Sequence, residues 1–210
     1  MILSLNEIEA TILKAARGAG MEWGLAEEAA QAARVLARSG VAIEAATLRL
    51  LQAAPWPNDF VIEGDALRPR EPEAWLCPIR VGACLSDLAD RRLKRVERVL
   101  CPLLLLPFAA RLDRSIRVGS DGAWLSLADH DARSRAGELP DRSSERAATV
   151  EIAPLEATAA KTRETLRRRG GVAIDMGAWR QLQAFEARTY VPASQRSRLH
   201  GAGAGAIDND

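Results

Sequence analysis

Residues 4–40 read SLNEIEATILKAARGAGMEWGLAEEAAQAARVLARSG, and this stretch decides the fold of the N-terminal part of the chain. It opens with a capping-box pattern, because the Ser4 hydroxyl can accept from the Glu7 amide while the Glu7 carboxylate returns to the Ser4 amide. Gly18 suits the left-handed position that ends a helix. Between these signals, apolar residues recur at helical spacing as Leu5, Ile8, Ile12 and Ala16. A first helix is therefore predicted up to Gly18.

Two more helices are predicted after the first. The second runs from about Leu25 to Ser39 and stops at Gly40, and the third runs from about Ile43 to Ala53, before Pro55. Because alanine-rich faces allow helices to approach closely, we expect the first two helices to pack as a hairpin. The apolar side of the second helix consists of Leu25, Ala29, Ala32 and Leu36.

The middle of the chain shows mixed patterns. Helical spacing predicts a helix over residues 86–99. The run Leu103–Leu106 lies between two prolines and is compatible with a buried strand. A further strand is predicted where apolar residues alternate with others, at Trp75, Cys77, Ile79 and Val81.

A hairpin and a closing helix are predicted further along. Strands at 116–118 and 124–127 flank the turn Asp121-Gly122, which predicts a hairpin. Residues 149–152 favour another strand. Residues 161–169 favour a helix that Gly170 ends, and Asp175 can cap a last helix. That last helix carries Trp179, Leu182 and Phe185.

The predicted fold class is α+β in a single domain over residues 1–210. A helical front (1–54) is an N-terminal helical hairpin plus a third helix. A mixed strand and helix part (55–153) holds a small sheet with a hairpin and an exposed loop at 129–146. A helical closing segment (154–200) and an irregular Gly-rich tail (201–210) follow.

Composition narrows the function class. The 210 residues are 48% hydrophobic with a net charge of +1, so no global field favours nucleic acid or a membrane surface. The longest apolar stretch, 103–110, contains Pro107 and is far shorter than the roughly 20 residues of a membrane helix. The three cysteines lack metal-ligand spacing and predict reduced thiols. No secretory signal is read before the first helix, so we expect a bacterial-type cytoplasmic protein without a metal or cofactor.

Charged residues gather where the first two predicted helices meet. Lys14 and Arg17 lie in the last turn of the first helix, and Glu27 lies in the first turn of the second. Such charges complement helix dipoles, which is one explanation for them. The other is a site in which Lys14 and Arg17 bind a carboxylate or phosphate and Glu27 acts as acid or base. Trp23 would wall that pocket or plug the helix joint.

The end of the chain supplies the other half of the hypothesis. The alternating glycines and alanines of 201–206 lack the lysine and following helix of a phosphate loop, and predict either a frayed end or a lid. In a lid, His200 would be a general base. Tyr190 would hydrogen-bond in the pocket or be half-buried for structural reasons. The other predicted ligand-binding residues are Ser194, Asp208, Asn209 and Asp210.

Several sequence phrases resemble an uncharacterised bacterial family, domain of unknown function 3726. They are SLNEIE at 4–9, KAARGAG at 14–20, WGLAEEA at 23–29, ARTYVPAS at 187–194 and the Gly-rich end. The resemblance implies no activity, but it implies that both ends of the chain belong to one design. The succession of helix, Gly-x-Gly, helix and Ser-Gly also resembles the start of non-Rossmann malate and L-lactate dehydrogenases, although their Ser-His-Gly is absent.

Two functions follow from these patterns. In the first, the protein binds a small anionic metabolite between the N-terminal helix pair and the C-terminal tail, and a catabolic enzyme is one form of this hypothesis. In the second, it is a non-catalytic accessory subunit that docks on a partner enzyme or on a second copy of itself. An exposed Trp56 between Pro55 and Pro57 would be the anchor of that docking surface.

Overall fold

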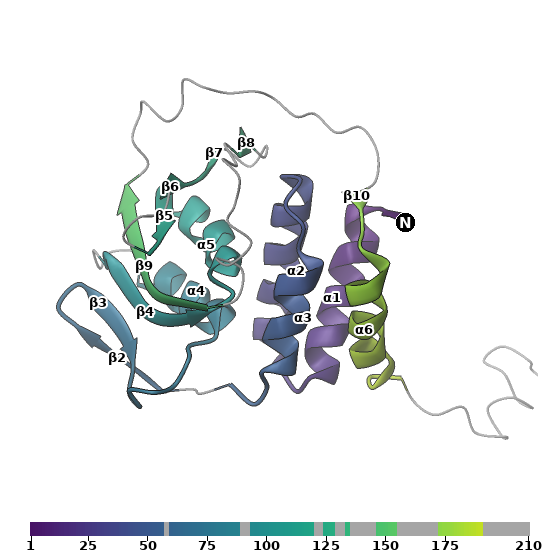
Figure 1. The fold of residues 1–210 in the computed structure, drawn as a ribbon, viewed down its shortest axis with the longest axis horizontal. Helices are drawn as coiled ribbons and strands as arrows, with labels where there is room; N and C mark the ends of the chain where they lie inside the picture. The colour runs from purple at the N-terminus through teal and green to yellow at the C-terminus, as the bar shows by residue number, and fades with distance from the viewer. Residues whose placement is uncertain are drawn as a thin grey trace, which may run out of the picture.

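The computed structural model describes residues 1–56, 59–88, 93–119, 124–128, 133–134, 146–154 and 172–190. The α+β class is confirmed. Figure 1 shows four helices side by side, with the main sheet and two further helices beyond them. The four are α1 (Leu5–Gly18), α2 (Trp23–Arg38), α3 (Glu44–Gln52) and α6 (Met176–Ala187).

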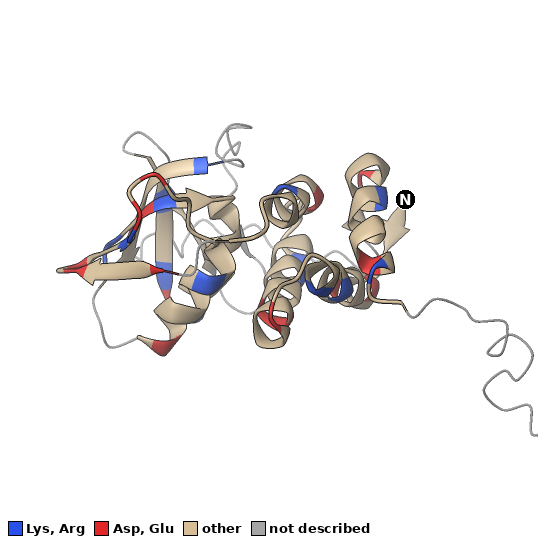
Figure 2. Cartoon of the chain, turned by 90° about the horizontal axis from the view of Figure 1, so that it is seen from below, with Lys and Arg blue, Asp and Glu red and all other residues tan. Residues whose placement is uncertain are grey.

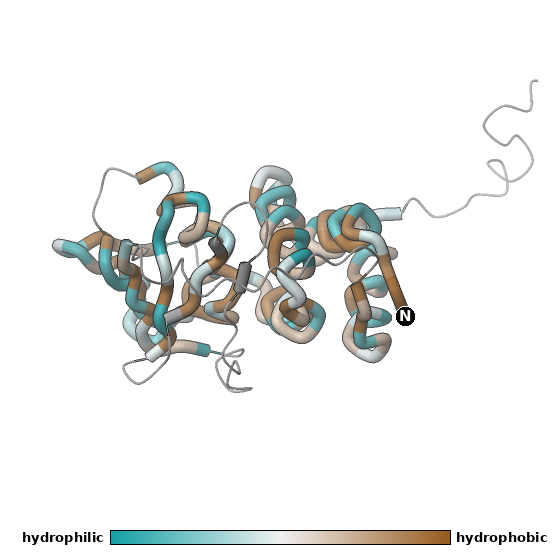
Figure 3. Tube along the Cα trace, turned by 90° about the horizontal axis from the view of Figure 1, so that it is seen from above, coloured by the Kyte–Doolittle hydropathy of each residue, from teal (hydrophilic) through white to brown (hydrophobic). Residues whose placement is uncertain are grey.

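The predicted N-terminal helices are present, and their apolar faces meet. The α1 face is buried at Ile8, Ile12, Ala15 and Ala16, and seven residues of α2 are buried, six of them alanine. In Figure 3 the tubes of these helices alternate between brown and teal, which is typical of helices with one buried face. The predicted hairpin of α1 and α2 is thus confirmed, because small side chains let the two backbones come close.

The capping box of α1 is confirmed atom by atom. The Glu7 amide donates to Ser4 Oγ at 3.2 Å, and the Ser4 amide donates to Glu7 Oε2 at 2.8 Å. The hydrogen bond from the Ser4 backbone, and then that from its hydroxyl, lower the pKa of Glu7. A depressed pKa means that this carboxylate stabilises the folded chain above its ordinary pKa of 4.5, and that the contribution disappears as the pH falls through the folded value.

Replacing Ser4 by alanine tests this cap. We expect the free energy of unfolding to fall by about 1 kcal/mol at neutral pH, the usual loss for an N-cap serine. The difference between variant and wild type should shrink once the pH is below 4.5, because protonated Glu7 accepts less strongly from the Ser4 hydroxyl, the donor that only the wild type has. Urea denaturation at both pH values measures it. A difference that is constant with pH would contradict the coupling of Ser4 to Glu7.

The predicted C-cap of α1 is wrong by two residues. The helix continues through Gly18, Ala19 caps it in the right-handed region, and Gly20 takes the left-handed conformation with φ of 94°. Gly18 has a different role, because a Cβ there would overlap the carbonyl oxygen of Phe185 and lie 2.8 Å from the carbonyl carbon. The missing side chain therefore lets α6 pack directly against α1.

Three predictions in the middle of the chain are wrong. The alternation at 75–81 is not a strand, because Pro78 occupies the first turn of α4 (Pro78–Asp87), where its missing N–H costs nothing. The helix predicted over residues 86–99 is also wrong, because α4 ends at Asp87 and Arg95–Leu100 form strand β4; residues 89–92 lie outside the described ranges. Residues 103–106 belong to a 3₁₀ turn (Pro102–Leu105) that leads into α5 (Leu106–Arg111).

The main sheet has six strands in the order β2-β3-β4-β9-β5-β6, with only the β3–β4 pair parallel among those described. The predicted hairpin is confirmed, since Ile116 pairs with Leu125. Its turn at Asp121-Gly122 lies outside the described residues. The strand predicted at 149–152 is confirmed within β9. The strands are β2 (Phe60–Glu63), β3 (Ala66–Pro69), β4, β5 (Arg114–Val118), β6 (Trp124–Leu125) and β9 (Arg146–Pro154).

Two short strand pairs complete the described structure. Strand β7 (Leu127–Ala128) pairs with β8 (Arg133–Ser134). Of the loop predicted at 129–146, the structure describes only β8 and Arg146, and Arg146 begins β9. Strand β1 (Ile2–Leu3) pairs with β10 (Val172–Ala173) and brings the start of the chain to α6. The predicted helix at 161–169 and the Gly-rich tail lie outside the described residues.

The last helix begins as predicted and packs on the helical front. Asp175 caps α6 by accepting from the Ala178 amide at 2.9 Å, and Trp179 and Leu182 are buried. One continuous cluster of buried side chains includes both the four-helix part and the sheet. Charges of both signs are intermixed over the described surface (Figure 2). Within the described ranges, no helix is long and apolar enough to cross a membrane.

Candidate functional site

A groove of about 640 Å³ lies where α1 ends, where the chain turns into α2, and where α6 ends. We call it the basic groove, because three cationic side chains line it. Its lining consists of Leu13, Lys14, Arg17, Gly18, Gly20, Trp23, Arg188 and Thr189. The structure therefore places three of the predicted ligand-binding residues, Lys14, Arg17 and Trp23, around one space.

Lys14 already has an acidic partner. Its Nζ lies 3.3 Å from Glu186 Oε1 and 3.5 Å from the phenol oxygen of Tyr190. The Tyr190 hydroxyl also donates to Glu186, which is 9% exposed. The hydrogen bond to Glu186, followed by that to Tyr190, raises the pKa of Lys14. Lys14 and Tyr190 therefore come together as predicted, but the Lys14 charge is balanced by the protein itself.

Arg17 has no such balance within the described residues. Its guanidinium donates to the Met21 carbonyl at 2.6 Å and lies 5.5 Å from the centre of the Trp23 ring. Trp23 is 60% exposed, so it forms the wall of the groove and does not plug the helix joint. Its indole N–H donates to Glu27 at 2.8 Å. Glu27 is therefore adjacent to the groove but not part of its lining.

Two residues of this candidate site were not predicted from the sequence. Arg188 lines the groove and stacks on Phe185, with 4.4 Å from guanidinium carbon to ring centre, and no carboxylate of the described residues pairs with it. Glu186 is the buried partner of Lys14. A cation just after α6 and the i, i+4 spacing of Glu186 and Tyr190 were the available signals.

The remaining predicted site residues lie outside the described residues. These are Ser194, His200, Asp208, Asn209 and Asp210. Their proximity to Arg17 and Glu27 stays a prediction. The described part of the site is thus the groove wall, with two arginines that have no acidic partner there and one aromatic face.

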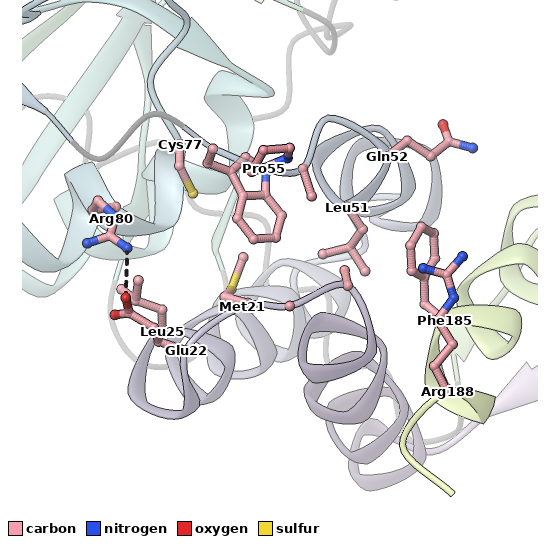
Figure 4. A pocket seen from close by; sticks show the side chains of 14 residues that line it. Met21, Glu22, Leu25, Leu51, Gln52, Pro55, Cys77, Arg80, Phe185 and Arg188 are labelled. Carbon is pink, nitrogen blue, oxygen red and sulfur yellow. Dashed lines mark ion pairs between the residues drawn. The ribbon is translucent and has the colours of Figure 1, made fainter.

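A second space adjoins the basic groove. We call it the apolar hollow, of about 640 Å³, and it lies between the α1–α2 turn, the end of α3, α4 and α6. Figure 4 shows Leu51 between Pro55 and Phe185, and Met21 on the side of the Arg80–Glu22 ion pair. Gly20 and Arg188 line both the groove and the hollow. The two spaces therefore meet at these residues.

Trp56 lines this hollow and is half-buried, whereas the sequence predicted an exposed side chain. Its indole N–H donates to the Leu50 carbonyl at 2.8 Å, and the half-buried ring packs against the core. The prediction that Trp56 is exposed is therefore wrong, and docking of a partner through it stays a prediction. The bond to Leu50 folds the Trp56 side chain back toward α3.

Cys77 is the buried thiol of the hollow. It precedes the first turn of α4 and is 2% exposed. Burial raises the pKa of this thiol, against a smaller lowering by the backbone amides of Arg80 and Ile79. The thiol form is therefore favoured at neutral pH. Within the described ranges, no three side chains of the metal-ligating types His, Cys, Asp and Glu gather at one point.

Comparison with known proteins finds a family match for the N-terminal part of the chain. No curated protein and no solved structure matches the chain. The C-terminal phrases that resemble the family, at 187–210, lie outside the matched segment, whereas the N-terminal resemblance is confirmed. Residues 3–49, which contain α1, α2 and the first part of α3, match the family described as "Protein of unknown function (DUF3726)".

Proposed function

We propose that this protein binds a small anionic metabolite in the basic groove, with Arg17 and Arg188 as the anion-binding residues. One observation carries the proposal: both arginines line one groove, and neither pairs with a carboxylate among the described residues. Several other arginines of the described surface do have acidic partners, as Arg34, Arg111 and Arg117 show. Two guanidinium groups without such partners favour an anion from outside the chain.

The surroundings of the two arginines support the same function. Trp23 and Phe185 lie against the guanidinium groups of Arg17 and Arg188, and this cation–π attraction leaves N–H groups free to donate beyond the bond from Arg17 to Met21. Lys14 adds positive potential, although Glu186 screens it. If the protein is an enzyme, Glu27 is the candidate for proton transfer to or from the ligand, and its carboxylate accepts a hydrogen bond from Trp23 in the groove wall. The sequence adds His200 as a second candidate.

Charge-removing variants test the site. Arg17→Gln and Arg188→Gln should each weaken binding of a carboxylate or phosphate by roughly tenfold or more, since a hydrogen bond to a charged group contributes about 1.5–3 kcal/mol. Arg180→Gln is the matched control, because Arg180 is exposed on the same helix α6 and lines neither space.

Thermal shift is the measurement for these variants, with inorganic phosphate and a panel of carboxylates as probes. Ligand at a hundredfold excess over Kd stabilises the folded state by about 2.7 kcal/mol. That amounts to a shift of several degrees for a chain of this size. Equal shifts in wild type, Arg17→Gln and Arg188→Gln would refute the proposed site, and so would the absence of any shift in wild type.

Closure of the site by the C-terminal tail stays a prediction from the sequence, and truncation tests it. A chain that ends at Leu199 lacks His200 and the Gly-rich tail. If the tail covers the groove, the truncated chain should melt at the wild-type temperature while its ligand affinity falls. Unchanged affinity would remove the tail, with Asp208, Asn209 and Asp210, from the proposed site. Loss of a dimer, seen by light scattering, would instead assign the tail to self-association.

A further inference from the structure

The apolar hollow and the basic groove share Gly20 and Arg188, and this junction tells what kind of anion fits. We propose that the ligand is an organic anion with an aryl or acyl body, whose acid group lies at Arg17 and Arg188 while its apolar body enters the hollow. The inference rests on the proposed function, and it names the ligand class of that same site.

The lining of the hollow is the first argument. Its apolar surface comes mainly from half-buried Leu25, Trp56 and Phe185, with the nearly buried Met21 and Leu51 also in the lining. Water in contact with such walls is replaced favourably by an apolar group. Ligand sites for small molecules combine such apolar walls with polar groups that fix the orientation, and here Glu22, Gln52, Arg80 and Arg188 are the polar part of the lining.

The charges of the hollow are the second argument. Glu22 and Arg80 lie on one side of it and pair with each other at 3.6 Å, so they cancel locally. The Cys77 thiol is neutral because burial raises its pKa. Arg188 is the cationic group that remains without an acidic partner in the described structure, and it lies at the end that opens to the groove. One acid group at that end and an uncharged body beyond it match this distribution.

Size is the third argument. The hollow measures about 640 Å³, within the roughly 300–1,000 Å³ of drug-sized ligand sites. Inorganic phosphate or a short carboxylate would occupy the groove end and leave the half-buried side chains of Leu25, Trp56 and Phe185 in contact with water. A ligand that also fills the hollow gains the free energy of apolar burial in addition to the ion pair.

A homologous series of carboxylates separates the two contributions. Titrations with acetate, butyrate, hexanoate, octanoate and 3-phenylpropionate should show affinity rising by about fourfold per methylene until the hollow is full, from about 0.8 kcal/mol per buried CH₂. Arg188→Gln should weaken every member that binds by a similar factor and leave the slope unchanged. Isothermal calorimetry gives both quantities.

Two variants place the apolar body. Leu25→Trp narrows the hollow from α2 and should flatten the slope, whereas Val35→Trp is the control, a half-buried position on α2 that does not line the hollow. Because either large side chain could impair folding, Trp56→Phe gives an independent readout. Chain-length-dependent change of tryptophan fluorescence should be lost in Trp56→Phe and kept in Trp75→Phe, since Trp75 lines neither space.

The outcomes distinguish this inference from the proposed function. Binding that depends on Arg17 and Arg188 but has no dependence on chain length overturns the inference and leaves the anion site standing. A slope that persists in Leu25→Trp, together with an unchanged fluorescence response in Trp56→Phe, places the apolar body elsewhere and also overturns it. Failure of every carboxylate and of phosphate to bind overturns the anion site itself.

Discussion

Replacing Gly18 by alanine will destabilise this protein, although alanine is the better helix former. Helix propensity alone favours the alanine variant by about 1 kcal/mol. The added Cβ, however, would overlap the Phe185 carbonyl oxygen and lie 2.8 Å from the carbonyl carbon. Overpacking of this kind typically costs about 1–3 kcal/mol, and a backbone atom has no rotamer by which to move away. Taking the upper end of this range and subtracting the propensity gain, we expect a net loss of about 2 kcal/mol, or roughly 4–8 °C in Tm.

Binding should fall with stability in the Gly18→Ala variant. Gly18 lines the basic groove, and its absent Cβ position is 3.4 Å from the Cβ of Arg188. If α6 moves away from α1 to relieve the overlap, Arg188 and Tyr190 move with it and the anion site widens. Ligand affinity measured well below the Tm should therefore drop, beyond what the unfolded fraction explains.

Gly24→Ala is the matched control for this prediction. Gly24 lies in the first turn of α2, and a Cβ there meets nothing within 4 Å. Alanine should therefore raise the free energy of unfolding by a few tenths to about 1 kcal/mol, through propensity alone. If Gly18→Ala stabilises as Gly24→Ala does, then α6 does not pack on α1 as closely as the structure shows.

The sequence predicts well those elements that have one solvent-exposed face and one buried face. In α1, α2 and α6 polar residues alternate with buried ones at helical spacing, so the period shows which face is buried. Their caps at Ser4 and Asp175 are local hydrogen bonds that four residues determine. The hairpin of β5 and β6 is equally local, because its two strands and turn are contiguous.

The segment from Leu76 to Ala109 lacks this information. In α4 the residues Pro78, Ile79, Val81, Gly82 and Leu85 are buried on more than one side, and Leu103–Leu106 are buried throughout. A run without a polar face gives no period, so strand and helix cannot be separated by alternation. Pro78 and Pro102 were the better signals, since each lies in the first turn of a helix.

The candidate site was predictable in part for a related reason. Lys14, Arg17 and Trp23 are close in sequence around one helix joint, and a local pattern brings them together. Arg188 and Glu186 enter through the packing of α6 on α1, which depends on Gly18. Glycine in a sequence indicates a helix end, and only the structure shows that this one is a contact between helices.

Replacing Gly82 by alanine should also destabilise the protein strongly, again because the added Cβ would overlap a neighbouring group. A Cβ at Gly82 would lie 2.7 Å from Cε2 of the buried Phe108 ring and still closer to two other ring atoms. Alanine at this position should cost about 2–3 kcal/mol, because the ring is enclosed and cannot rotate away. Chemical denaturation measures the loss.

A double-mutant cycle separates this overlap from an ordinary helix effect. Phe108→Leu alone should destabilise by creating a void beside α5. Combined with Gly82→Ala, it should destabilise less than the sum of the two single changes, with a coupling of about 1–3 kcal/mol, since the smaller side chain leaves room for the new methyl group. Additive losses would mean that Gly82 and Phe108 are not in contact. Additive losses would also contradict the described position of α4. The apolar hollow depends on that position, because α4 carries Arg80 and begins next to Cys77, which both line it.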